Sequence, residues 1–284
     1  MGSPALPLRI GRIDYLNIWP IFHYLTKQFP ENKGFAYLPD HPSGLNRALH
    51  QGELDLSPSS LFEYLLHGEQ YRLLPGASIS CDGPVQSVLL VSPVPPAELS
   101  EYLDANESGL GVSSASATSV ALLKILCAFS WNLGEIDWIP IAPGTGISRG
   151  MPFLEIGNRA LELHIHPPKG WHIIDLGSAW KKLTGLPFVF AVWIARQDLS
   201  PQKQNTILDV ARFLESNKRR VLENLEELAD LPDVPGEFTK DELVSYWKVL
   251  RYDLGPRETA AIAVYADYCT RLGLIPGMPA LHWV

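Results

Sequence analysis

Residues 186–195 constrain the fold of this chain most, because they form an uninterrupted apolar run that follows a glycine–proline turn. Aromatic and β-branched side chains dominate the run, which is typical of a strand buried on both faces of a sheet. The run is about half as long as a membrane-spanning helix requires, so we exclude a membrane segment here. It predicts a central strand in an α/β protein.

A second stretch, residues 111–120, predicts an anion-binding turn at the start of a helix. An expected strand ends here in a hydroxyl-rich turn, and an apolar helix follows. One hydroxyl is enough to cap a helix, and five in seven residues exceed that need. Hydroxyls and backbone N–H groups at a helix N-terminus suit a carboxylate. The hydroxyls belong to Ser113, Ser114, Ser116, Thr118 and Ser119.

The order of expected elements predicts two α/β lobes. At 284 residues the chain is longer than most single domains. Strands alternate with helices, which indicates parallel or mixed sheets covered by helices on both faces. We expect strands at 8–13, 55–57, 86–92, 109–113, 137–141, 153–156, 172–176 and 188–195. We expect helices from about residue 20 and at 43–50, 58–68, 118–131, 178–183, 205–229, 240–252 and 257–272.

Two breaks in this pattern predict where the chain crosses between the lobes. The proline-rich segment 93–96 disfavours both a helix and a central strand, and 184–187 is a glycine–proline turn. We therefore expect one lobe from residues 1–92 plus 191–284, with the C-terminal helices. The second lobe, residues 93–190, would be inserted into it.

Polar turns that follow expected strands predict a shared ligand cleft between the lobes. Asn17, Ser59 and the turn at 114–119 each follow a strand. Ligands of such folds bind at the carboxyl ends of strands, so these turns are expected to converge. A glycine–proline pair at Gly83 would let a ligand approach the backbone, with Ser87 pointing inward.

Composition limits the partners. The formal charge is −8 and the pI is near 5.5, without a basic stripe to neutralise phosphates, so nucleic acid is not expected. The three cysteines are far apart and have no metal-ligand spacing, which favours a reducing compartment. The N-terminal residues lack the pattern of a signal peptide, so we expect a soluble, cytoplasmic protein.

Two weaker patterns are interpreted as non-functional. His164 and His166 would lie on one face of a strand, but no further ligand stands at metal-binding spacing, so no metal is expected. The glycine-rich segment 144–150 is spaced wrongly for a dinucleotide loop, and prolines flank it. We interpret it as a loop at the lip of the cleft, and expect no cofactor.

Several segments together resemble chorismate dehydratases, in which they occur in the same order. The resemblance runs from about Leu8 to the last expected helix, and its most specific part is the glycine–proline turn with the strand after it. The segments are Asp14-Tyr15-Leu16-Asn17, Ser80-Cys81-Asp82-Gly83-Pro84-Val85-Gln86-Ser87-Val88, Ser116-Ala117-Thr118-Ser119, Ile156-Gly157-Asn158-Arg159-Ala160-Leu161, Asp175-Leu176-Gly177-Ser178-Ala179-Trp180 and Thr184-Gly185-Leu186-Pro187-Phe188-Val189-Phe190-Ala191-Val192-Trp193.

The resemblance implies a type II periplasmic-binding-protein-like fold and an enzyme of the futalosine route to menaquinone. Such an enzyme converts chorismate, a small dicarboxylate, into 3-[(1-carboxyvinyl)oxy]benzoate and water. The sister enzyme that acts on cyclic dehypoxanthinyl futalosine carries a Ser-Pro-Cys-Pro-Asn-type motif near its start, where this chain has Asp14-Tyr15-Leu16-Asn17. The dehydratase is therefore favoured, while that cyclase and a non-catalytic anion-binding protein of the same fold stay open. The oligomeric state is not predicted.

The resemblance also implies roles for particular residues. Asn17 and Ser87 are the expected catalytic residues. No residue in the matched turns is an obvious base, so the substrate's own enolpyruvyl carboxylate is expected to take the proton, against Asp14 and His23 as candidates. Asn158 stands where the family usually has an aspartate, and its amide would keep the shape without the charge. The expected substrate-binding residues are Ser59, Gly83, Val85, Ser114, Ser116, Thr118, Ser119 and Asn158.

Overall fold

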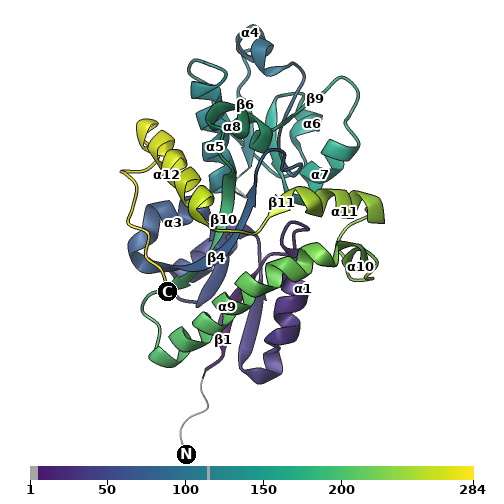
Figure 1. The fold of residues 1–284 in the computed structure, drawn as a ribbon. Coiled ribbons are helices and arrows are strands. Elements are labelled where there is room, and N and C mark those ends of the chain that lie inside the picture. The colour runs from purple at the N-terminus through teal and green to yellow at the C-terminus, as the bar shows by residue number, and fades with distance from the viewer. Residues whose placement is uncertain (1–5, 114–115) are drawn as a thin grey trace, which may run out of the picture.

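The chain folds into two α/β lobes, which a computed structural model describes over residues 6–113 and 116–284 (Figure 1). In the view of Figure 1 a six-stranded sheet forms the lower lobe and a five-stranded sheet the upper one. Residues of both lobes share one continuous buried apolar cluster, so the lobes are packed against each other. The interface between the lobes is therefore part of the core.

The six-stranded sheet has the order β11–β4–β10–β3–β1–β2. β1 pairs in parallel with β2 and β3, and β10 runs antiparallel between β3 and β4. The strands are β1 (Leu8–Arg12), β2 (Phe35–Pro39), β3 (Leu56–Ser60), β4 (Tyr71–Cys81), β10 (Phe188–Arg196) and β11 (Leu250–Arg251). The apolar run is thus a central strand, as its composition predicts.

The five-stranded sheet has the order β7–β6–β8–β5–β9. β6 pairs in parallel with β7 and β8, and β5 runs antiparallel to β8 and β9. Its strands are β5 (Val88–Ser92), β6 (Leu110–Ser113), β7 (Trp138–Ile141), β8 (Phe153–Ile156) and β9 (His172–Asp175).

Helices cover both sheets (Figure 1). Up to β10 they are α1 (Trp19–Gln28), α2 (Pro42–His50), α3 (Leu61–His67), α4 (Leu99–Ala105), α5 (Ala117–Phe129), α6 (Gly146–Arg149), α7 (Gly157–Ile165) and α8 (Leu176–Thr184). The C-terminal helices are α9 (Pro201–Glu223), α10 (Leu225–Ala229), α11 (Lys240–Val249) and α12 (Pro256–Arg271). Short 3-10 turns lie at Glu31–Lys33, Gly68–Gln70 and Pro96–Glu98.

The first crossing between the lobes lies earlier than we expected. β4 belongs to the six-stranded sheet and β5 to the other, so the chain crosses at residues 82–87. The expected crossing at 93–96 is wrong, because those prolines follow β5 and lead through a 3-10 turn into α4. The chain returns through residues 185–187, between α8 and β10.

Other expectations also fail locally. His164 lies on α7, whereas we expected it on a strand. The sequence misled here because a short stretch with alternating apolar residues suits either structure. Ser59 belongs to β3 and does not open a helix. The loop expected at 144–150 contains α6, and the long helix expected at 205–229 is split into α9 and α10.

The carboxylate of Asp175 fixes the first crossing. It accepts hydrogen bonds from the backbone N–H groups of Val85 and Gln86, at 3.0 and 2.6 Å. It also caps α8 by accepting from Ser178 N–H at 2.8 Å. Gln86 has a φ of 62°, which non-glycine residues rarely adopt, so the crossing needs such external support.

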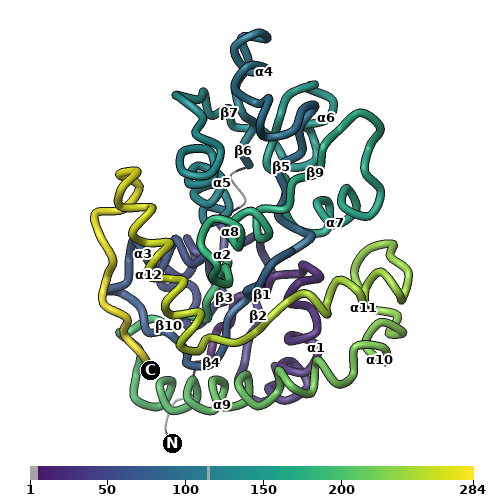
Figure 2. The backbone as a smooth tube through the Cα atoms, turned by 45° about the horizontal axis from the view of Figure 1, so that its top comes forward, coloured from purple at the N-terminus to yellow at the C-terminus, as the bar shows by residue number. Residues whose placement is uncertain are grey.

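The C-terminal helices contact both lobes. Figure 2 shows α9 along the base of the molecule, with α11 and α12 on opposite sides of the view. Tyr246 of α11 donates a hydrogen bond to Ser87 at the first crossing, and Tyr265 of α12 donates one to the Thr118 carbonyl of α5. Helices α11 and α12 are therefore hydrogen-bonded to the first crossing and to the second lobe, respectively.

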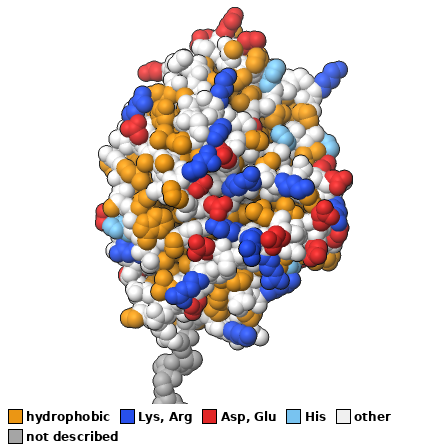
Figure 3. All heavy atoms as spheres, viewed as in Figure 1, with side chains coloured by type: hydrophobic (Ala, Val, Ile, Leu, Met, Phe, Trp, Pro, Cys, Tyr) orange, Lys and Arg blue, Asp and Glu red, His pale blue; other side chains and the backbone are white. Residues whose placement is uncertain are grey.

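The surface carries mixed charge. In Figure 3 Lys and Arg side chains lie among Asp and Glu side chains over the face in view. On α9, Lys218 pairs with Asp253 and Arg219 with Glu223, so the charges of these two basic side chains are balanced. Among the described residues, we find no helix that is both apolar enough and long enough to span a membrane.

We predict that Asp175→Ala lowers the free energy of unfolding by about 2 kcal/mol or more, because α8 loses its cap and the N–H groups of Val85 and Gln86 lose their acceptor. Denaturant unfolding measures this. Asp209→Ala is the matched control, since Asp209 forms an exposed ion pair with Arg212 and its loss should change stability by less than about 0.5 kcal/mol. Equal stability of the two variants would contradict the role given to Asp175.

Candidate active site

A small cavity of about 60 Å³ lies between the lobes, where strand ends of both sheets meet. It lies beyond the carboxyl ends of β1, β3 and β8, beside the start of the antiparallel β10. Strand ends and helix starts are where α/β folds place their ligands. Its lining residues are Ile13, Tyr15, Asn17, Pro42, Ser59, Ser60, Ile79, Val85, Ser87, Val88, Ser116, Ser119, Ile156, Gly157, Phe190 and Ala191.

Two buried polar atoms of the lining lack a partner. Asn17 Oδ1 and Ser59 Oγ are enclosed, and neither makes a hydrogen bond to any residue that the structure describes. Buried polar atoms are nearly always hydrogen-bonded, and leaving one unpaired costs roughly 1–3 kcal/mol. A bound ligand that supplies the missing partners would remove this cost, so the two atoms mark the cavity as a binding site.

Ser87 is buried in the lining and held by a tyrosine. The Tyr246 hydroxyl donates to Ser87 Oγ at 2.8 Å, and Ser87 Oγ in turn donates to the Val85 carbonyl over a long 3.4 Å. Burial raises the pKa of Tyr246, so it remains a neutral donor. The Ser87 proton is therefore weakly held and free to turn toward a ligand.

Helix N-termini from both lobes point their positive ends toward the cavity. Pro42 begins α2, Ser60 caps α3, Ser116 caps α5, and Gly157 begins α7. Each N-terminus favours negative charge by about 0.3–1 kcal/mol. Among the described lining residues there is no Lys, Arg or His. The cavity would thus hold an anion by dipoles and hydroxyls.

Gly157 brings the second lobe close to the loop that carries Tyr15. Its φ is +70°, and a Cβ atom there would meet the Tyr15 ring at 3.4 Å. Its N–H also donates to the Ser87 carbonyl at 2.9 Å. The positive φ favours a glycine at this position, whereas the ring would be in ordinary van der Waals contact with a Cβ atom.

The loop that carries Asn17 is fixed from three sides. Leu16 N–H donates to Asn158 Oδ1 at 3.0 Å, and the Leu16 carbonyl accepts from the Trp247 indole at 2.8 Å. The Tyr252 hydroxyl donates to the Asn17 carbonyl at 2.9 Å. Asn158 does not line the cavity, and acts through this loop. Its amide oxygen is an acceptor of a kind that a carboxylate could also supply.

The remaining expected residues divide into two groups. Val85, Ser116 and Ser119 line the cavity with Asn17, Ser59 and Ser87. Thr118 lies outside the lining, since its hydroxyl accepts from Phe62 N–H and joins α3 to α5. Gly83 also lies outside, and its carbonyl accepts from the Cys81 thiol. Ser114 falls outside the described residues.

The sequence reasoning missed the apolar wall and Tyr15. Ile13, Ile79, Ile156 and Phe190 give the cavity an apolar side that suits a carbon ring. Burial raises the pKa of Tyr15, and Glu155 adds to the shift, so Tyr15 stays protonated. Its place beside Asn17 in the matched segment was the available signal. Ile79 could not be assigned to this wall from the sequence, because β4, the strand that carries it, was not expected.

Among the described lining residues there is no carboxylate. Asp14 is exposed and paired with Arg12, and His23 contacts Lys27 on α1. Glu155 is buried, which raises its pKa, and it accepts from Gly144 N–H away from the lining. The described part of the lining therefore offers no protein carboxylate or imidazole as a base.

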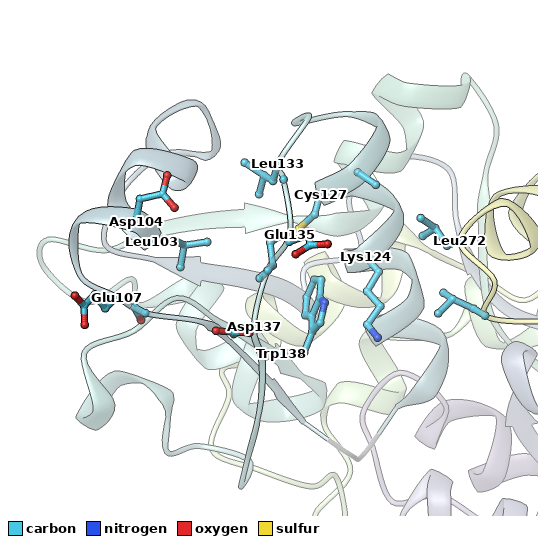
Figure 4. Close-up of a pocket in the computed structure, with 15 residues that line it drawn as sticks. Leu103, Asp104, Glu107, Lys124, Cys127, Leu133, Glu135, Asp137, Trp138 and Leu272 are labelled. Atoms are coloured by element: carbon cyan, nitrogen blue, oxygen red, sulfur yellow. The ribbon is translucent and has the colours of Figure 1, made fainter.

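A wider groove of about 780 Å³ lies on the second lobe, between α4, α5 and residues 133–138 (Figure 4). Lys124 there lies 5.2 Å from the centre of the Trp138 ring. The groove's carboxylates would repel an anionic ligand, so we do not assign the site to it. They belong to Asp104, Glu107, Glu135 and Asp137.

Comparisons of sequence place the chain among known proteins. Residues 8–271 match the model of a family described as "Menaquinone biosynthesis". A chorismate dehydratase of Thermus thermophilus is 30% identical over 245 residues, which cover 79% of this chain and 81% of that protein. A chorismate dehydratase of Campylobacter jejuni is 27% identical over 272 residues, 93% of this chain and 98% of that one.

Solved structures show the same fold. A protein of Archaeoglobus fulgidus superposes with a TM-score of 0.71 at 16% identity, over 94% of this chain and 98% of that one. The periplasmic aliphatic sulphonate-binding protein of Escherichia coli gives a TM-score of 0.58 at 14% identity, over 99% and 94%. The periplasmic-binding-protein-like fold expected from the resemblance is confirmed.

We predict that Asn158→Ala lowers the free energy of unfolding by about 1–2 kcal/mol, because Leu16 N–H loses its acceptor. Asn158→Asp should stay within about 1 kcal/mol of the wild type, since a carboxylate accepts the same bond and is favourable at the start of α7. Thermal and denaturant unfolding measure both, with the exposed Asn106→Ala as control. A destabilised Asp variant beside an unaffected Ala variant would refute this role.

Proposed function

We propose that this chain, which belongs to the menaquinone-biosynthesis family, dehydrates chorismate to 3-[(1-carboxyvinyl)oxy]benzoate as a hydro-lyase. The observation that carries the proposal is a pair of buried atoms, Asn17 Oδ1 and Ser59 Oγ, that have no partner among the described residues. They lie in a cavity whose described lining residues include no Lys, Arg or His. Relatives named as chorismate dehydratases over most of their length support the same activity.

The two unpartnered atoms suit different parts of chorismate. A carboxylate oxygen only accepts hydrogen bonds, so it cannot satisfy Asn17 Oδ1, which needs a donor. The ring hydroxyl at carbon 4 is the one donor on the chorismate dianion, and it is the group that leaves. We therefore assign Asn17 to that hydroxyl. Ser59 can donate to a carboxylate. At the start of α5 the Ser116 and Ser119 hydroxyls are hydrogen-bonded to each other at 2.9 Å, which leaves one of the two free to donate as well.

The reaction then needs little more than positioning and electrostatics. The proton leaves ring carbon 3, and the C–H electron pair delocalises through the diene into the ring carboxylate. Its return expels hydroxide from carbon 4, and the proton from carbon 3 completes the water molecule. Hydroxyl and N–H donors against the ring carboxylate stabilise the charge that builds up. Aromatisation makes the overall reaction strongly favourable.

We assign the base to the substrate's enolpyruvyl carboxylate. The described lining offers no carboxylate or imidazole, and Tyr15 and Tyr246 are neutral because burial raises their pKa values. The enolpyruvyl carboxylate is attached through oxygen to ring carbon 3, within reach of its proton. Ser87, oriented by Tyr246, would hold this group in place.

Substrate entry requires the cavity to grow. A volume of about 60 Å³ holds a few water molecules, whereas pockets for small ligands are roughly 300 Å³ or more. The two crossings, at 82–87 and 185–187, are the points about which the lobes would separate. We also place the enzyme in the cytoplasm, because its three cysteines are free and buried, as suits a reducing compartment.

The direct test is incubation of the purified protein with chorismate, followed by ultraviolet absorbance and mass measurement of the product. We expect an aromatic product that is lighter than chorismate by the mass of one water molecule. Tight binding of chorismate without a product would favour a non-catalytic anion-binding protein. Turnover of cyclic dehypoxanthinyl futalosine would favour the sister cyclase.

We predict that Asn17→Ala and Ser87→Ala each lower kcat by about 10²-fold or more, the usual effect of removing one group that orients or stabilises reacting atoms. Asn17→Ala should not lower the unfolding midpoint, because Asn17 Oδ1 makes no hydrogen bond to any described residue. Ser216→Ala, an exposed change on α9, is the control. Unchanged kinetics in both variants would remove the two residues from the site.

We predict that Asp14→Asn and His23→Gln keep turnover within about threefold of the wild type, because neither side chain lines the cavity. Loss of a true general base would cost about 10²–10⁴-fold. Steady-state kinetics and a separate measurement of ligand affinity decide. A variant that binds normally but does not turn over would assign the proton transfer to that side chain.

A further inference from the structure

We propose that His50, Glu63 and His67 form a binding site for a divalent transition metal of the zinc class. His50 ends α2, and Glu63 and His67 lie one turn apart on α3. One potential ligand atom from each of the three lies within 4.8 Å of the others. These residues belong to neither the cavity nor the proposed reaction.

The distances suit a metal after small side-chain rotations. Imidazole nitrogens and carboxylate oxygens bind zinc at about 2.0–2.2 Å, so tetrahedral ligands lie about 3.4 Å apart. The present separations exceed this by about 1.4 Å at most. The imidazole rings of His50 and His67 already lie close together, with centroids 5.1 Å apart and planes tilted by 50°. His50 is exposed, so its ring can turn without disturbing the core.

The donor set indicates which metals would bind. Two imidazoles with one carboxylate suit Zn²⁺, Co²⁺ and Ni²⁺, whereas Mg²⁺ and Ca²⁺ prefer oxygen ligands alone. Three protein ligands leave a fourth position for water. The spacing of Glu63 and His67, four residues apart, places both on one face of α3.

The surroundings support the ligands. The buried Tyr71 hydroxyl donates to Glu63 Oε1 at 2.9 Å, which orients the carboxylate as outer contacts of metal sites do. His50 and His67 are the last residues of their helices, where the dipole favours a cation. Arg196, which donates to the His50 carbonyl, is paired with Asp198. Its charge therefore opposes a metal only weakly.

A metal here would join two helices that also shape the cavity. The start of α2 at Pro42 and the cap of α3 at Ser60 line the cavity, while His50 and His67 lie at the opposite ends of these helices and Glu63 lies in the first turn of α3. A helix of nine residues is about 13 Å long, so the ion would not touch the substrate. We therefore expect the metal to stabilise this face of the first lobe without entering the reaction.

The test is metal titration of chelator-treated, untagged full-length protein. Calorimetry with Zn²⁺ should give one site per chain, and Co²⁺ should give the visible absorption of a tetrahedral site. Zn²⁺ should also raise the unfolding midpoint of the wild type. His50→Ala, Glu63→Gln and His67→Ala should each weaken Zn²⁺ binding at least about tenfold, and Tyr71→Phe about tenfold through the carboxylate.

The matched control is a variant with both His164→Ala and His166→Ala, which removes two histidines elsewhere and should bind Zn²⁺ as the wild type does. Thermal unfolding without metal shows whether each variant is folded. Absence of Zn²⁺ binding to the wild type would overturn the proposal. Equal binding by the wild type and the His50→Ala, His67→Ala double variant would also overturn it. Chorismate turnover is not a readout here, so this outcome is independent of the proposed function.

Discussion

Convergence of helix N-termini from both lobes is the constraint on which the proposed site depends. Helices α2, α3, α5 and α7 directly follow strands β2, β3, β6 and β8, and the first or capping residue of each helix lines the cavity, so the positive helix ends lie there. A doubly charged acid can then be held without any Lys, Arg or His among the described lining residues. This explains why an acidic chain of net charge −8 is compatible with a dianionic substrate.

The same convergence has a consequence for ligand binding. Asn17 Oδ1 and Ser59 Oγ have no hydrogen-bond partner among the described residues, so a bound molecule has to supply one to each. The bracing is extensive: Asn158, Trp247 and Tyr252 fix the Asn17 loop, and Tyr246 fixes Ser87. Rigid placement of unsatisfied groups is how a site is made ready for a ligand before the ligand arrives.

Local sequence patterns predicted much of the fold but few of the long-range hydrogen bonds that hold the Asn17 loop and Ser87. The apolar run of β10 and the Ser116 cap of α5 are visible in the sequence because period and capping are local properties.

β4 was missed because Pro75 and Gly76 interrupt it at a bulge against β10. The first crossing was misplaced because Asp175 fixes it from about ninety residues away. Six of the expected site residues line the cavity. Asn158 and Thr118 lie outside its lining, where contacts with residues distant in the sequence place them.

The central claim is that the inter-lobe cavity, and no other hollow, receives the substrate. A crystal structure with 3-[(1-carboxyvinyl)oxy]benzoate bound tests this most directly. The account predicts the product between the lobes, with a carboxylate oxygen within hydrogen-bonding distance of Ser59. It also predicts a water molecule beside Asn17, at the place that the departing hydroxyl of the substrate would occupy. Product bound only in the groove beside Trp138, with the cavity unchanged, would contradict it.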